Sequence, residues 1–142
     1  MVEDATQGVR VVAPGQTHAG KQGFTYGTGA SRATVGARGV SMVVLPMPPG
    51  ARAKVHLHEG IETIALLLEG ECTVHYGDRL AQQVTVRAGE QVYLPGGVPH
   101  APSNESGLPC RWVVVHSSGD DQDGIVMLPE LDAVLARKVG AG

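Results

Sequence analysis

The stretch that decides how this chain folds is GARAKVHLHEGIE, residues 50–62. His56 and His58 are two residues apart, so on an extended strand both side chains leave by the same face. Glu62 has the same parity, and we expect the turn between His58 and Glu62 to preserve that register. Two imidazoles and a carboxylate on one face form an incomplete site for a first-row transition metal.

A second stretch, GEQVYLPGGVPHAPSN at residues 89–104, supplies the missing ligand. His100 directly follows a turn made of two prolines and two glycines, and such a turn is rigid enough to aim one side chain. Burying three histidines and a carboxylate in an apolar interior is costly unless a cation compensates them. We therefore predict one metal site, whose ligands are His56, His58, Glu62 and His100.

These two stretches resemble the two motifs of the cupin superfamily. In the first, five residues separate Gly50 from His56, one separates His56 from His58, three separate His58 from Glu62, and Gly70 follows. In the second, five residues separate Gly89 from Pro95, one separates Pro95 from Gly97, two separate Gly97 from His100, and three separate His100 from Asn104. The one departure is that seven residues, rather than the usual six, stand between Glu62 and Gly70.

The resemblance implies an all-β fold, the double-stranded β-helix or jelly-roll barrel, with a short C-terminal helix in this chain. It also implies one divalent transition metal per chain, with Fe²⁺ favoured and Mn²⁺, Ni²⁺ or Zn²⁺ as alternatives. By analogy with other small cupins, the partners are a small-molecule substrate and a second copy of the chain in a homodimer.

Four protein ligands leave two neighbouring positions of an octahedral ion open, which suits dioxygen and a substrate side by side. One carboxylate leaves the centre net positive, so we expect an anionic substrate, and the apolar residues around the site favour a partly aromatic one. The first hypothesis is an Fe(II) dioxygenase. The alternatives are an oxygen-independent isomerase, lyase or decarboxylase, and a barrel that binds a ligand without turnover. Glu62 and His116, on a later strand, are the candidates for moving protons.

Composition narrows the function further. The net charge is −3 and the only adjacent pair of basic residues is Arg137-Lys138, so nucleic-acid binding has no electrostatic basis. There is no apolar run of 18 residues, and the first residues are acidic, so we expect neither a membrane segment nor a signal peptide but a cytoplasmic protein. Cys72 and Cys110 are isolated and are expected to be reduced.

Glycine makes up 20 of 142 residues, which is typical of many short strands joined by tight turns. We expect a single domain over residues 1–142. Its barrel spans about 38–118, after an N-terminal arm at 1–37 that contains a short strand at 9–13. A glycine-rich stretch at 16–39 is expected to be mainly a solvated loop, with Phe24 and Tyr26 as packing anchors. A strand at 124–128 and a helix at 130–139 complete the C-terminal part, 124–139.

Overall fold

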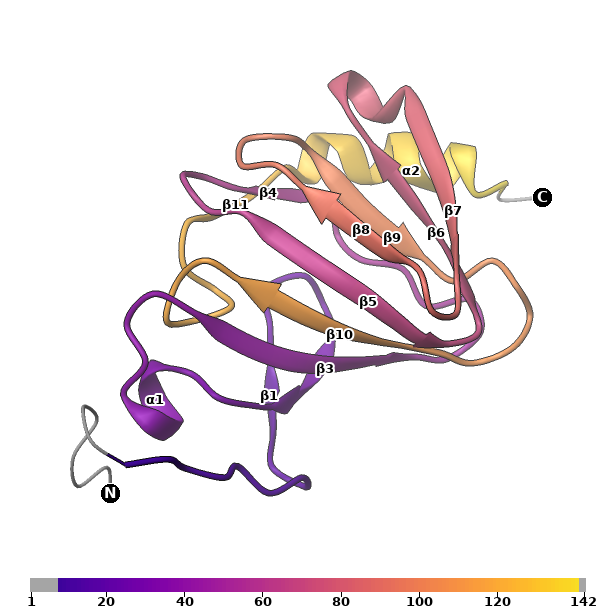
Figure 1. Ribbon diagram of the computed structural model, residues 1–142. Coiled ribbons are helices and arrows are strands. Elements are labelled where there is room, and N and C mark those ends of the chain that lie inside the picture. The colour runs from indigo at the N-terminus through magenta and orange to yellow at the C-terminus, as the bar shows by residue number, and fades with distance from the viewer. Residues whose placement is uncertain (1–7, 141–142) are drawn as a thin grey trace.

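The computed structural model describes residues 8–140, which form two antiparallel β-sheets packed face to face (Figure 1). The six-stranded sheet has the order β1-β2-β3-β10-β5-β8, and the five-stranded sheet has the order β11-β4-β9-β6-β7. The strands of the first sheet are β1 (Thr17–Ala19), β2 (Thr25–Thr28), β3 (Ser41–Met47), β10 (Cys110–His116), β5 (Thr63–Glu69) and β8 (Gln91–Leu94). Those of the second are β11 (Ile125–Met127), β4 (His56–His58), β9 (His100–Ser103), β6 (Glu71–Tyr76) and β7 (Gln82–Arg87). This is the expected all-β jelly-roll architecture, built as two facing sheets rather than as a closed ring of strands.

Alternating side chains of the strands build the core between the sheets. Along β3 the buried residues are Ser41, Val43, Leu45 and Met47, while the residues between them are more exposed. Strand β10 adds Trp112 and β6 adds Val74, so both sheets contribute to one apolar cluster. The period of two is what places one set of side chains inside and the other outside.

Short helical segments lie outside the sheets. They are α1 (Arg32–Val35), η1 (Asp78–Leu80), η2 (Pro129–Leu131) and α2 (Asp132–Lys138). Helix α2 matches the expected C-terminal helix, with Asp132 in its first turn and Arg137 and Lys138 in its last, as the helix dipole favours. No helix within residues 8–140 is long and apolar enough to cross a membrane.

The N-terminal arm differs most from expectation. Residues 9–13 do not form the expected strand. Residues 17–28, expected to be mainly a solvated loop, form the hairpin β1–β2 instead, which extends the six-stranded sheet through the pairing of β2 with β3. Phe24 and Tyr26 do pack against the core, as expected. Strand β11 lies within the expected 124–128 segment and pairs with β4.

Candidate metal centre

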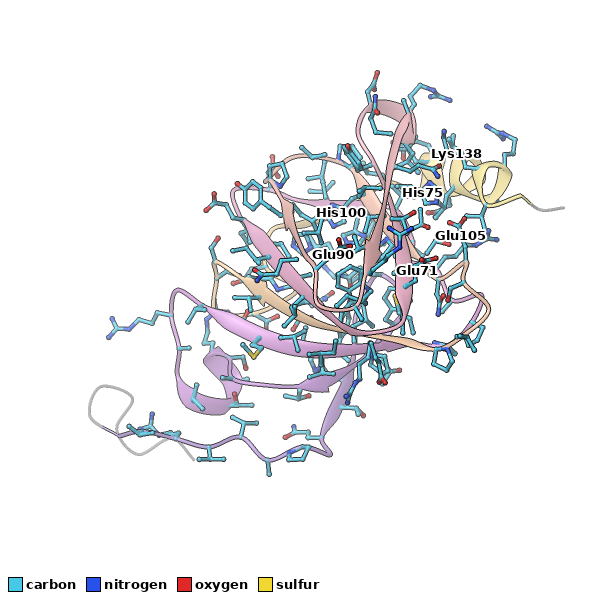
Figure 2. The ribbon with its side chains drawn as sticks, turned by 45° about the vertical axis from the view of Figure 1, so that its right-hand side comes forward. Glu71, His75, Glu90, His100, Glu105 and Lys138 are labelled. Carbon is cyan, nitrogen blue, oxygen red and sulfur yellow. The ribbon has the colours of Figure 1, made fainter. Side chains whose placement is uncertain are left out.

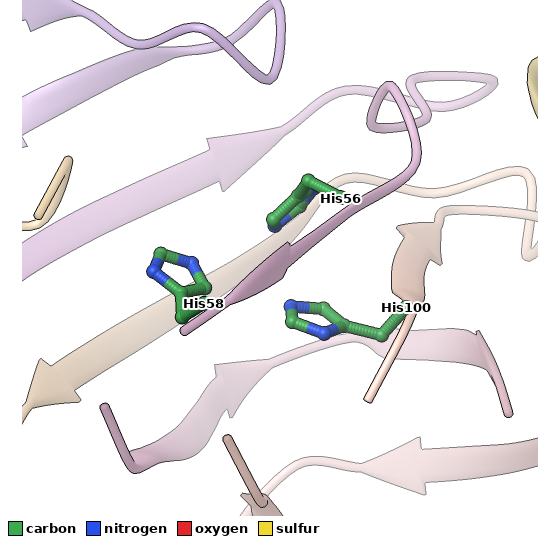
Figure 3. Close-up of side chains that lie close together, drawn as sticks. All are labelled: His56, His58 and His100. Carbon is green, nitrogen blue, oxygen red and sulfur yellow. The ribbon is translucent and has the colours of Figure 1, made fainter. Parts of the chain in front are cut away.

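Strands β4 and β9 bring three histidines together. His56 and His58 leave β4 by the same face, and His100 is the direct cross-strand partner of His56. All three are buried, and each offers a ring nitrogen that lies within 4.8 Å of those of the other two. Figure 3 shows the three rings turned toward one another from the two strands. The structure thus brings together three of the four residues expected to bind a metal.

The hydrogen bonds of these rings leave one nitrogen of each ring available. Nδ1 of His56 donates to the Lys54 carbonyl at 2.7 Å, and Nδ1 of His100 donates to the Val98 carbonyl at 3.0 Å. A longer contact of 3.4 Å joins His58 Nδ1 to the Asp123 carbonyl. A carbonyl only accepts, so each Nδ1 carries the proton and each Nε2 keeps its lone pair. Metal-binding histidines are held in this way by backbone carbonyls.

Backbone hydrogen bonds fix the position of the main chain that carries these histidines. The amide of Gly97 donates to the His58 carbonyl at 2.8 Å, and the amide of Glu59 donates to the Gly124 carbonyl at 2.7 Å. Gly97 has a φ of 79°, a value that disfavours any side chain, which explains why the turn before His100 contains glycine there. The Pro-Gly-Gly turn therefore leads into β9 and also forms a hydrogen bond with the end of β4.

His116 lies beside this group without belonging to it. It sits at the end of β10 in the opposite sheet, and its ring centroid is 4.9 Å from that of His58. The residue is buried, and its Nδ1 has no hydrogen-bond partner among residues 8–140. The sequence placed His116 on a strand, and the structure adds that its ring is buried and lacks the carbonyl contact that orients the other three.

Glu62, the expected fourth ligand, is not brought to the group. Its side chain is exposed and accepts a hydrogen bond from the Tyr93 hydroxyl at 2.8 Å on the outer face of the six-stranded sheet. Parity is lost at the turn, where Gly60 has a φ of 70°. Strand β5 then begins with Thr63 facing inward, since Thr63 is buried and Ile64 is exposed. The extra residue between Glu62 and Gly70 was the signal of this shift.

His75, the histidine of β6, faces away from the centre. It pairs with Ala101, the neighbour of His100, so its side chain leaves the other face of the sheet. There its Nε2 lies 2.7 Å from Glu105 Oε2 (Figure 2). Asn104, at the end of the second motif, has a structural role, because its side-chain amide donates to the carbonyls of Met47 and Leu108.

A small apolar cavity of about 60 Å³ opens in front of the histidines. Its apolar walls are Phe24, Leu45, Ala65, Val74, Val92, Leu94, Pro102, Trp112 and Val114. Its polar residues are Gln22, Tyr26, His56, His58, Thr63, His100 and His116. Sequence reasoning assigned no role to Gln22 or Thr63. No lysine or arginine of the described chain lines this cavity, so charge inside it comes only from what binds there.

Burial keeps the four histidines neutral. It lowers the pKa of His56 and His58, and lowers those of His100 and His116 to about 4, with neighbouring histidines adding to the effect at His116. A neutral imidazole is the form that binds a metal, so the site needs no proton release near neutral pH. Three nitrogens of this type, at bond lengths of about 2.0–2.1 Å for zinc, suit one divalent transition ion.

These lowered pKa values predict a pH-dependent stability of the metal-free protein. Below about pH 6.5 the unfolded chain binds protons on its histidines, whereas the folded chain does so only near pH 4. The free energy of unfolding should therefore fall between pH 7 and pH 5, by roughly 1–2 kcal/mol for each such histidine. Urea unfolding of metal-free protein at pH 7, 6 and 5 measures this.

The variant His116→Gln should show a smaller decrease over the same range, because one of the contributing groups is removed. An equal pH dependence in His116→Gln and in the wild type would contradict a lowered pKa at His116.

One curated relative matches about half of the chain. The chain is 35% identical over 78 residues to 3-hydroxyanthranilate 3,4-dioxygenase of Xanthomonas euvesicatoria pv. vesicatoria (strain 85-10), a match covering 54% of this chain and 44% of that protein. The chain thus spans less than half the length of this curated relative.

Two solved structures share the fold at low sequence identity. An oxalate oxidase in complex with the substrate analogue glycolate superposes with a TM-score of 0.67 at 23% identity, over 99% of this chain and 83% of that one. The oxalate decarboxylase formate complex of Lactobacillus farciminis gives a TM-score of 0.66 at 17% identity, over 83% of this chain and 35% of that one. The family model for the cupin domain matches residues 43–116, just over half of the chain. This range contains all four histidines of the cavity. The chain belongs to the cupin family.

Proposed function

We propose that this protein is a metal-dependent cupin enzyme that oxidises a small anionic molecule with dioxygen on Fe(II). The observation that carries the proposal is the set of three buried imidazoles that share one cavity wall and are each held through Nδ1. The similarity to a dioxygenase over 78 residues supports the oxidative reaction. A bound Fe(II) supplies the redox chemistry with dioxygen, whereas Mn(II), Ni(II) or Zn(II) in the same ligands supplies Lewis acidity.

The ligand charge defines the substrate. Three neutral imidazoles leave the full +2 charge of the ion in a cavity without a carboxylate, since Glu62 lies on the outer face. An uncompensated charge in an apolar site is costly, so an anionic group of the substrate stabilises the complex. Carboxylates and enolates meet this requirement.

The size of the cavity limits the rest of the substrate. About 60 Å³ is less than the roughly 150 Å³ of an engineered cavity that holds benzene. An aromatic substrate would need the walls to move apart. We therefore favour a small aliphatic acid or enolate over the aromatic substrates that the sequence also suggested.

His116 is suited to moving a proton within this cavity. It is neutral at pH 7, because burial lowers its pKa to about 4, and Nδ1 is not held by a carbonyl. It can therefore accept a proton from a substrate carbon or oxygen in front of it. This observation also favours a second candidate, an oxygen-independent isomerase, lyase or decarboxylase that uses the ion as a Lewis acid.

Metal content tests the ligand set. Wild-type protein reconstituted anaerobically with Fe(II) or Zn(II) should hold about one ion per chain, and His100→Ala should lose most of it, because one of the three nitrogens is removed. Glu62→Gln should retain the ion, since its carboxylate faces away. Elemental analysis of the three proteins measures this. Loss of the ion in Glu62→Gln would restore Glu62 as a ligand, and full retention in His100→Ala would refute the site.

Oxygen consumption separates the two candidate reactions. The Fe(II) protein should consume dioxygen with at least one of pyruvate, oxalate, acetylacetone and 3-hydroxyanthranilate, and His116→Gln should slow turnover about 10²-fold or more at unchanged iron content. An oxygen electrode and product analysis under air and under nitrogen measure this. Equal conversion of a compound under nitrogen would replace the dioxygenase by the second candidate.

We also propose that the protein is a homodimer. Across β3, β10, β5 and β8 the residues Met42, Val115, Ile64 and Tyr93 are successive cross-strand neighbours on the outer face of the six-stranded sheet. Three of them are 45–54% exposed, although large apolar side chains in a continuous row favour contact with another surface. A second copy related by a two-fold axis presents the same apolar row, so each face matches the other.

Light scattering tests this assembly. Wild-type protein should have twice the mass of the chain, and Ile64→Lys should be monomeric, because it places two charges at the contact. Val84→Lys is the matched control, since Val84 is an apolar residue of similar exposure, 40%, on the other sheet. A monomeric wild-type protein would refute the dimer.

A cytoplasmic location is also part of the proposal. Cys72 and Cys110 are both buried and free, and they lie in the same core cluster. Thiols that stay unpaired suit a reducing compartment.

A further inference from the structure

We infer that Gln22 recognises the substrate, by donating a hydrogen bond from its side-chain amide to an oxygen of the molecule bound in front of the three histidines. The inference rests on the proposed function, and it adds a residue that selects the substrate. Gln22 lies in the β1–β2 hairpin and lines the cavity. Only 3% of its surface is exposed to solvent.

The orientation of the Gln22 amide follows from its neighbours. The backbone amide of Lys21 donates to Gln122 Oε1 at 2.9 Å, so the other end of the Gln122 side chain is its NH₂ group. That group donates to Asp121 Oδ2 at 2.9 Å and to Gln22 Oε1 at 3.0 Å. The oxygen of Gln22 is therefore the end bound to Gln122, and its NH₂ is the end that remains.

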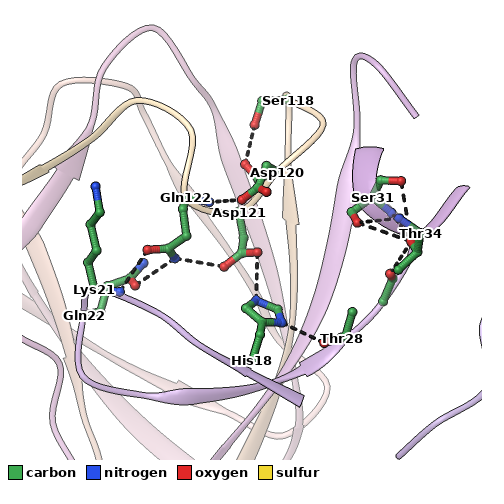
Figure 4. Close-up of polar contacts among 11 residues, drawn as sticks. His18, Lys21, Gln22, Thr28, Ser31, Thr34, Ser118, Asp120, Asp121 and Gln122 are labelled. Carbon is green, nitrogen blue, oxygen red and sulfur yellow. Dashed lines mark hydrogen bonds and ion pairs between the residues drawn. The ribbon is translucent and has the colours of Figure 1, made fainter. Parts of the chain in front are cut away.

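A buried network holds these amides in place (Figure 4). Asp121 is 5% exposed, and its other oxygen, Oδ1, is 3.0 Å from His18 Nε2. His18 Nδ1 is in turn 2.8 Å from the Thr28 hydroxyl, and the His18 ring stacks on Tyr26. Both carboxylate oxygens of Asp121 and both the oxygen and the NH₂ group of the Gln122 amide take part in hydrogen bonds. Gln122 is therefore held in place, and the Gln22 amide bonded to it has little freedom to turn.

The free NH₂ of Gln22 has no hydrogen-bond partner among residues 8–140. It is also not among the fully enclosed polar atoms without a partner, which are Ser41 Oγ, His75 Nδ1, Trp112 Nε1 and His116 Nδ1. This NH₂ group is therefore not completely enclosed by protein, and Gln22 is one of the residues that line the cavity. A buried donor left without a partner costs about 1–3 kcal/mol, and a ligand oxygen removes that cost.

Backbone contacts tie Gln22 to the metal centre. The Lys54 amide donates to the Gln22 carbonyl at 2.9 Å, and the Lys54 carbonyl accepts from His56 Nδ1 at 2.7 Å. One residue thus links Gln22 to a histidine of the centre. Gln22 and the three histidines hold different parts of the same small ligand.

The kind of group that Gln22 selects follows from its charge. A neutral amide donor binds a carbonyl or carboxylate oxygen, and no cation of the described chain lines the cavity to compete for it. Thr63 and Tyr26 also line the cavity, but a hydroxyl hydrogen can rotate, whereas the Gln22 amide is held by Gln122. The substrate class is therefore a short aliphatic anion with a second oxygen besides the group that faces the metal.

The experiment uses three small acids, namely formate, glycolate and oxalate, on Zn(II)-loaded and on metal-free full-length protein. Gln22→Met removes the donor and keeps the side-chain length, Gln122→Met removes the group that holds Gln22, and Gln83→Met changes an exposed glutamine of β7 as the control. Metal content and urea unfolding are measured for each variant. Calorimetry gives the dissociation constants, and NMR follows the side-chain amide signals of Gln22, identified by their loss in Gln22→Met.

We expect glycolate or oxalate to bind about 5- to 100-fold more weakly to Gln22→Met, by loss of one buried hydrogen bond, with metal content unchanged. Gln122→Met should lose less affinity, because the donor is present but free to turn, and Gln83→Met should bind as the wild type does. In wild-type protein the Gln22 amide signals should shift when the acid is added. Formate, which has no second functional group, should be affected least.

Two results would overturn the inference. One is unchanged affinity of all three acids in Gln22→Met, together with unshifted Gln22 signals in the wild type. The other is the absence of binding to wild-type protein in both the metal-loaded and the metal-free state. Failure of the proposed function is seen separately, as an absence of bound metal in the wild type, and the Gln22 signals in metal-free protein still decide the role of Gln22.

Discussion

Desolvation of four imidazole rings is the constraint on which this structure depends. His56, His58, His100 and His116 lie within one apolar cavity, with ring centroids as close as 4.4 Å. Water is largely excluded, so none of the four can carry a proton near neutral pH without a large cost. Under this condition, backbone carbonyls accept hydrogen bonds from Nδ1 of three rings. The Nε2 lone pairs of those rings are left available to a Lewis acid.

The two sheets divide the work around that cavity. The five-stranded sheet holds the three carbonyl-bound histidines on adjacent strands, where cross-strand pairing sets their spacing. The six-stranded sheet places His116 and Thr63 opposite them as direct cross-strand partners. The hairpin β1–β2 then adds Gln22, Phe24 and Tyr26 to the wall. In the function proposed here, metal binding, proton transfer and substrate selection fall to separate segments of the chain.

Sequence reasoning succeeded where a local rule fixes the outcome. The jelly-roll architecture, β11 and α2 follow from turn residues, helix-end residues and the family motifs, and parity alone places His56 and His58 on one face. It did not anticipate the outward position of Glu62, because parity cannot be carried through a turn in which Gly60 adopts a positive φ. Gln22 could not be found at all, since its orientation depends on Gln122, one hundred residues away, and no local pattern encodes such a contact.

The position of the β1–β2 hairpin relative to the cupin match has a consequence for specificity. The part of the chain that matches the family begins at residue 43, whereas the hairpin ends at Thr28, so the segment with Gln22 lies outside the family-defining part. If Gln22 selects the substrate as inferred, a change of substrate preference requires no change in the strands that carry the three histidines.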